Sequence, residues 1–125
     1  MKRLTLGFAC FLLILPFALA GIDITTDVPE APVNIIVTGT DAANYSFSLS
    51  WDPVPGATGY YIYQIPGGSY TRKVRCLATT PDPITVPSAE IKKITLNTEY
   101  WYVVTAYNVN GESLPSNHVV VKLTR

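Results

Sequence analysis

The chain has 125 residues, 48% of them hydrophobic, and its nine basic and nine acidic residues give a formal net charge of zero. This composition excludes a disordered polyelectrolyte and a strongly basic nucleic-acid binder, and it is enough for one ordinary domain. Ten prolines and eight tyrosines against one methionine favour short strands and turns, because proline breaks helices and tyrosine prefers strands. We therefore expect an all-β fold.

Residues 1–20 have the pattern of a signal peptide. Lys2 and Arg3 form a basic start, residues 4–17 are apolar and uncharged, and residues 18–20 read Ala-Leu-Ala, which suits a signal peptidase. The apolar stretch is shorter than the roughly 20 residues that a spanning helix needs, so we expect cleavage and no stable membrane span afterwards. The mature protein is then expected to begin near Gly21 and to be secreted or periplasmic.

Residues 21–31 are expected to form a flexible leader, and residues 32–125 a single domain. The leader is polar and contains Pro29, whereas alternation of apolar and polar residues begins after Pro32. Cys76 would be the only cysteine left after export, so it cannot form an internal disulfide. Burial is the favoured interpretation of this thiol, and a bond between chains is the alternative.

The predicted strands are short. Alternation is clearest over residues 45–51, where Tyr, Phe, Leu and Trp take the odd positions and Ser the even ones, so that one face is buried. A turn rich in proline and glycine follows at residues 52–59. In chain order we predict strands at residues 33–38, 45–51, 60–65, 70–78, 90–96, 100–108 and 117–123, with at most a short irregular one at 84–86. About seven strands at this spacing predict an antiparallel two-sheet sandwich.

The stretch from Ile94 to Ser113 resembles the signature of fibronectin type III domains around their sixth strand. That family places a threonine two residues before a tyrosine, as at Thr98 and Tyr100, then alternating apolar residues, an alanine, an asparagine and a glycine-containing loop. The resemblance covers residues 32–123. It implies an immunoglobulin-like sandwich, although residues 72–87 are rich in proline and hard to align with the family.

The resemblance also implies three structural roles. Tyr100 would form a tyrosine corner, with its hydroxyl bonded to backbone upstream, and Trp51 would meet Tyr60 in the core. The sequence fits an immunoglobulin domain proper less well. That fold carries a cysteine on the second strand, where this chain has Trp51 or Leu49, and another at the position of Tyr102.

Catalytic, metal and cofactor patterns are missing from the sequence. His118 is the only histidine, and no Gly-x-Ser-x-Gly elbow accompanies it. One histidine and one exported cysteine cannot build a zinc site, the acidic residues are too scattered for a calcium loop, and no glycine-rich phosphate loop occurs. We therefore predict a protein that is not an enzyme and has no metal or cofactor.

Alternation also predicts which side chains point outward. If Tyr60 and Tyr102 point into the core, their odd-numbered neighbours point to solvent. The topology implied by the resemblance pairs the two strands in one sheet, which would gather an exposed aromatic patch made of Tyr61, Tyr63, Trp101, Val103 and Tyr107. The other sheet presents Ser46, Ser48 and Ser50 and is expected to be inert.

Two functions fit such a patch. Tyrosine and tryptophan combine apolar area with a polar tip, which suits protein interfaces and sugar stacking. Our first hypothesis is an exported binding or adhesion module that contacts an extracytoplasmic protein or a second copy of itself. The alternative is a carbohydrate-binding accessory module that takes polysaccharide. Aromatic pairs that merely stabilise the sheet are the third interpretation.

Overall fold

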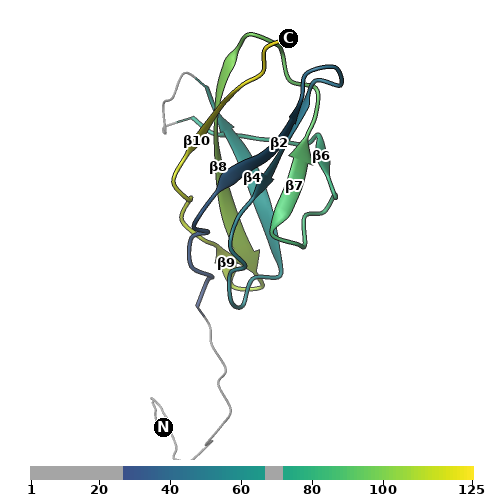
Figure 1. Ribbon diagram of the computed structural model, residues 1–125. Coiled ribbons are helices and arrows are strands. Elements are labelled where there is room, and N and C mark those ends of the chain that lie inside the picture. Colours follow the sequence, from purple (N-terminus) through teal and green to yellow (C-terminus); the bar gives the residue numbers. More distant parts are fainter. Residues whose placement is uncertain (1–26, 67–71) are drawn as a thin grey trace, which may run out of the picture.

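The computed structural model describes residues 27–66 and 72–125, which form two antiparallel sheets packed face to face (Figure 1). The described residues contain nine strands and almost no helix. The predicted all-β sandwich is therefore confirmed. No helix within the described ranges is long and apolar enough to span a membrane.

The first sheet has the spatial order β2-β3-β7-β6. Its strands are β2 (Ile36–Asp41), β3 (Ser46–Ser50), β7 (Ser88–Ile91) and β6 (Thr79–Thr80). The second sheet has the order β10-β8-β4-β5, and β9 pairs with β8 as a hairpin. Its strands are β10 (Val119–Lys122), β8 (Glu99–Asn108), β4 (Gly59–Ile65), β5 (Val74–Arg75) and β9 (Gly111–Glu112).

The structure departs from the predicted strands mainly between residues 72 and 93. The strand expected at 70–78 is reduced to β5 among the described residues, and the one expected at 84–86 is a single bridge between Ile84 and Tyr60. Prolines at 81, 83 and 87 remove backbone donors on both sides of Ile84, which explains why its pairing is a single bridge. The strand expected at 90–96 starts earlier, at Ser88, and ends at Ile91. Lys93 has a φ of 62°, which an extended strand cannot continue through.

The core lies between the two sheets, and each central strand buries alternate residues. Phe47 and Leu49 of β3 face Tyr102 and Val104 of β8, and all four are essentially inaccessible to solvent. Trp51 and Tyr60, which the resemblance places together, are buried with ring centroids 5.2 Å apart in an edge-on arrangement. Burial of such large side chains is the main source of stability in a sandwich.

Two tyrosine hydroxyls are held by backbone groups upstream or nearby. The Thr95 N–H donates to the hydroxyl oxygen of Tyr100 at 3.2 Å, five residues back along the chain, which is the geometry of a tyrosine corner. The Val54 N–H donates to the hydroxyl oxygen of Tyr60 at 3.1 Å. Both contacts satisfy a backbone donor near the core edge.

The end of the expected leader is attached to the domain. The side-chain amide of Asn108 donates to the carbonyl oxygen of Asp27 at 3.0 Å, and Pro29 is buried. Residues 27–31 therefore lie against the turn between β8 and β9. The predicted signal peptide and residues 21–26 of the leader lie outside the described residues.

Candidate functional site

The candidate site is the outward side of β4 and β8, which we call the aromatic face and define by Tyr61, Tyr63, Trp101 and Tyr107. The two strands pair so that Tyr61 lies opposite Thr105, Tyr63 opposite Val103, and Ile65 opposite Trp101. Residues directly opposite in an antiparallel pair share one face of the sheet. The register therefore places all five residues of the predicted patch on one side of the sheet.

Val103 corrects the prediction that every member of the patch is exposed. Its side chain is on the expected side but has 0% exposure, as does Thr105 two residues further along. Ile65, also expected to face solvent, is 1% exposed. Val103 and Thr105 are short, and a larger ring lies directly across the strand pair from each: Tyr63 opposite Val103, and Tyr61 opposite Thr105. The four aromatic residues are themselves half-buried.

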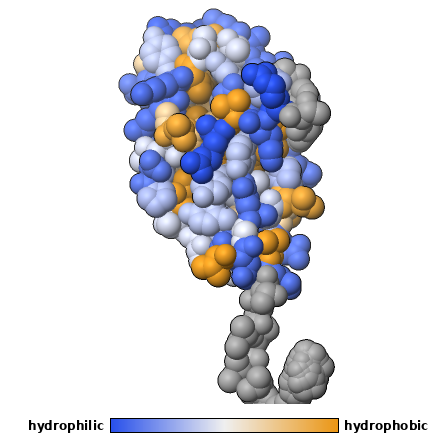
Figure 2. All heavy atoms as spheres, turned by 180° about the vertical axis from the view of Figure 1, so that it is seen from behind, coloured by the Kyte–Doolittle hydropathy of each residue, from blue (hydrophilic) through white to orange (hydrophobic). Residues whose placement is uncertain are grey.

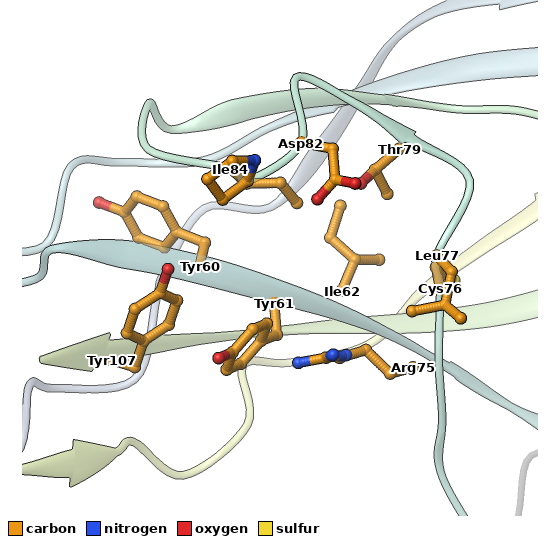
Figure 3. Close-up of a pocket in the computed structure, with 11 residues that line it drawn as sticks. Tyr60, Tyr61, Ile62, Arg75, Cys76, Leu77, Thr79, Asp82, Ile84 and Tyr107 are labelled. Atoms are coloured by element: carbon orange, nitrogen blue, oxygen red, sulfur yellow. The ribbon is translucent and has the colours of Figure 1, made fainter.

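A stack of three side chains crosses the aromatic face. The rings of Tyr61 and Tyr107 have centroids 4.5 Å apart with an interplanar angle of 21°. The guanidinium carbon of Arg75, on β5, lies 4.5 Å from the centroid of Tyr61. Figure 3 shows Tyr107 and Arg75 on opposite sides of the Tyr61 ring. Stacked rings and a cation above a ring are both attractive arrangements.

Gly59 makes this stack possible. It pairs with Tyr107, and a Cβ at this position would lie 2.2 Å from the Tyr107 hydroxyl oxygen and 2.3 Å from the adjoining ring carbon. The ring of Tyr107 therefore occupies the space that any larger residue at position 59 would fill, and it reaches Tyr61 across the bare backbone.

Tyr63 and Thr105 share one carboxylate. Both hydroxyls donate to Oε2 of Glu112 on β9, at 2.6 Å from Tyr63 and 2.5 Å from Thr105. The ammonium of Lys73 lies 4.7 Å above the Tyr63 ring. Burial, together with the hydrogen bond to Glu112 and its negative charge, raises the pKa of Tyr63 to about 12. Tyr63 is therefore a neutral donor at physiological pH.

The other end of the face carries Trp101 and His118. Their rings are stacked with centroids 4.4 Å apart and an interplanar angle of 13°. Val120 on β10 lies directly opposite Trp101 and is 44% exposed. This end of the face is therefore a ring pair beside an exposed aliphatic side chain.

Hydrophilic and hydrophobic residues are interspersed on this side of the molecule. Figure 2 views the molecule from the side of this sheet and shows blue and pale residues between separate orange ones, with no continuous apolar area. The face offers ring edges, hydroxyls and cations. Among residues 27–66 and 72–125, no group of three His, Cys, Asp or Glu side chains lies close enough to hold a metal ion.

A groove of about 220 Å³ borders the aromatic face (Figure 3). Its walls include Tyr61, Tyr107 and Arg75 on one side and Asp82 and Ile84 on the other. Sequence reasoning missed the groove, Arg75 and Lys73, because residues 72–87 had no assigned pairing. The available signal was the cluster of basic residues at Arg72, Lys73 and Arg75.

Comparisons with known proteins agree with this architecture. The profile of the fibronectin type III domain family matches residues 30–122. Similar solved structures include the crystal structure of FN3tt, at 21% identity and a TM-score of 0.64, with 79% of this chain and 98% of that chain covered. A Fn3-like protein from Clostridium thermocellum has 22% identity, a TM-score of 0.59 and coverages of 79% and 97%.

The FN1–FN3 domains of chicken CNTN1 are similar too, at 20% identity and a TM-score of 0.66, with 77% of this chain and 32% of that chain covered. The comparison with curated proteins found no match. Since the family profile spans three quarters of the sequence and the sandwich has the topology described above, the chain belongs to the fibronectin type III domain family.

Proposed function

We propose that this chain is an exported, non-catalytic binding module that contacts another protein through the aromatic face. Fibronectin type III domains are often used in protein–protein interaction. Membership of the family identifies neither the partner nor the binding surface. The choice of surface comes from the geometry of β4, β5 and β8.

The stack of Tyr107, Tyr61 and Arg75 is the observation that carries the proposal. Tyrosine, tryptophan and arginine are the residue types that contribute most binding energy in protein interfaces. Here all three types lie on one side of one sheet, with the tyrosine and tryptophan rings half-buried, Arg75 exposed, and each side chain in contact with a neighbouring ring. Preordered side chains lose little conformational entropy when a partner binds.

The same geometry favours a protein partner over a sugar. A sugar ring stacks on an open aromatic face, but Tyr61 has Arg75 on one side and Tyr107 on the other. Trp101 is covered by His118, and Tyr63 by Lys73. Polysaccharide would have to displace these groups, whereas a protein surface can contact ring edges, hydroxyls and cations as they stand.

Site-specific photocrosslinking tests the proposed surface. A photoreactive phenylalanine replaces Trp101 in the chain expressed in its native source, and the matched control carries it at Ser48, on the outer side of the other sheet. We expect a discrete protein adduct from position 101 and none from position 48. Adducts of equal yield from both positions would rule out a preferred face.

Glycan binding is measured in parallel with an immobilised glycan array. Retention of a glycan by the parent chain, and its loss in Tyr61→Ala, would support the polysaccharide alternative and count against the protein contact. We expect no retention.

Export rests on the sequence of residues 1–20 alone and has its own test. We expect the chain recovered outside the cytoplasm to begin at or near Gly21 when its N-terminus is determined by mass spectrometry. Recovery of the intact chain from the cytoplasm would contradict export and leave the binding surface untouched.

A further inference from the structure

Strand β5 is a free edge of the sheet that carries the aromatic face. Among the described residues it is the last strand of the order β10-β8-β4-β5, and both of its residues are exposed. The Cys76 N–H donates inward to the Ile62 carbonyl oxygen at 2.9 Å. Main-chain groups of successive residues point to opposite sides of an antiparallel strand, so the N–H and C=O of Arg75 point away from β4. Within residues 27–66 and 72–125, these two groups have no hydrogen-bond partner.

Two cations lie on the aromatic side of this edge. The Lys73 ammonium lies 4.7 Å from the centroid of the Tyr63 ring, and the Arg75 guanidinium carbon lies 4.5 Å from the centroid of the Tyr61 ring. Both cations are exposed, and no carboxylate in the described part of the chain forms an ion pair with either. Val74, between them, is 50% exposed and points to the opposite side of the strand. The edge therefore alternates cation, apolar residue and cation.

The other sheet edges lack this pattern. β2 has no basic residue, β6 has two threonines followed by Pro81, and β10 has one cation, Lys122, after three valines. Charged side chains on an edge disfavour the addition of a neutral strand or of a second copy of the same strand. The same charges favour an acidic strand, so the cations of β5 discriminate between partners.

We infer that β5 is a strand-addition site for an extended acidic segment of the partner protein. The added strand bonds to the outward main-chain groups of Arg75 and continues the sheet beyond β5. Because opposite residues of paired strands share a face, its acidic side chains occupy alternate positions beside Lys73 and Arg75. The residue between them is apolar and covers Val74. The inference rests on the proposed function and specifies the chemistry of the partner.

NMR titration of the isotope-labelled chain with synthetic peptides tests the site. The first peptide is acetyl-Ser-Thr-Glu-Val-Glu-Thr-Ser-amide, the second has glutamine in place of both glutamates, and the third has the order Ser-Thr-Val-Glu-Glu-Thr-Ser. We expect saturable shifts at residues 73–75 with the first peptide. The second should bind about tenfold more weakly, since each exposed ion pair corresponds to about threefold in affinity. The third should bind about threefold more weakly than the first, because one carboxylate then points to the other side of the strand.

Amide exchange with solvent reports main-chain pairing directly. The Arg75 amide hydrogen should exchange more slowly in the complex with the first peptide. The Cys76 amide hydrogen is already bonded to the Ile62 carbonyl oxygen, so its exchange should change little.

Two double variants with the same change in charge assign the preference to β5. Lys73→Gln combined with Arg75→Gln should reduce the affinity for the first peptide to that for the glutamine peptide. Lys122→Gln combined with Arg125→Gln removes one lysine and one arginine outside this edge and should leave the affinity unchanged.

Two sets of results would overturn the inference. An absence of saturable shifts at millimolar peptide would show that β5 accepts no strand. Equal affinity for the two glutamate peptides, or unchanged exchange of the Arg75 amide, would show a patch that attracts any polyanion, an acidic polysaccharide included. A protein adduct at position 101 without peptide binding at β5 would support the proposed function and reject strand addition.

Discussion

The two sides of β8 are both buried at the centre of the strand, but by different means. On the inner side, Tyr102 packs against Phe47 of the opposite sheet, with ring centroids 5.0 Å apart. On the outer side, Val103 and Thr105 are covered by rings and charged side chains of their own sheet. The residues of the second sheet that bury the inner side cannot move away without unfolding the domain. The side chains that bury the outer side lie at the surface, so a bound partner can take their place. Stability should therefore depend mainly on the inner side and binding on the outer side.

The largest difference in the free energy of unfolding is expected between variants in which an aromatic residue is truncated on the inner or on the outer side. Phe47→Ala should lower the free energy of unfolding by about 3–5 kcal/mol, because it opens a cavity in a closed core. Tyr61→Ala removes a stack at the surface and should cost only about 0.5–1.5 kcal/mol. Urea denaturation of both variants measures the difference, and equal losses would remove the distinction between the two sides.

Hydroxyl deletions sharpen the comparison within the core. Tyr60→Phe leaves the Val54 N–H without its acceptor and should cost about 1–3 kcal/mol. Tyr102→Phe removes a hydroxyl that has no partner among the described residues, so the free energy of unfolding should stay the same or rise. The two variants are compared by thermal and urea unfolding. A loss in Tyr102→Phe as large as that in Tyr60→Phe would show that this hydroxyl is already satisfied.

Gly59→Ala tests the outer side alone. The added Cβ would overlap the end of the Tyr107 ring, which is able to swing outward, so we expect the stack on Tyr61 to be lost with a cost of about 0.5–1.5 kcal/mol. The ring-current shifts of Tyr61 protons report the stack directly. Unchanged shifts would mean that the backbone moves and the ring does not.

The smallest effect concerns alkaline pH. The pKa of Tyr63 is raised from 10 to about 12 in the folded chain, so above pH 10 the unfolded state loses this proton first. The contribution of Tyr63 to stability is complete below pH 10 and is lost as pH rises towards 12. Tyr63→Phe should therefore make the decline over this range shallower. The raised pKa of Tyr102 acts in the same direction, so part of the slope should persist. A slope identical to that of the parent would contradict the role assigned to Glu112.

The sequence was most informative where residues alternate without interruption. The strands predicted at 45–51 and 100–108 match β3 and β8 closely, because strict alternation determines both the element and its buried side. Alternation does not determine how deeply a residue is buried. The prediction for Val103 was correct for the side of the sheet and wrong for its exposure. The exposure of this side chain depends on the size of the residues across the strand pair.

The remainder of the site could not be read from the sequence. Arg75 contacts Tyr61 because β5 pairs with β4 at Tyr63 and Gln64, and a two-residue strand is too short to give a periodic signal. Likewise, Glu112 reaches Tyr63 through the β8–β9 hairpin, a contact 49 residues apart in the chain. Both contacts are set by long-range pairing and not by local pattern.

The most direct test of the account combines two readouts on one variant, Tyr61→Ala with Trp101→Ala. We expect the photocrosslinked adduct, now probed from position 107, to disappear while the free energy of unfolding falls by less than Phe47→Ala alone, because both rings lie on the exchangeable outer side. An adduct that persists, or a loss of stability as large as that of Phe47→Ala, would contradict the assignment of binding to this face.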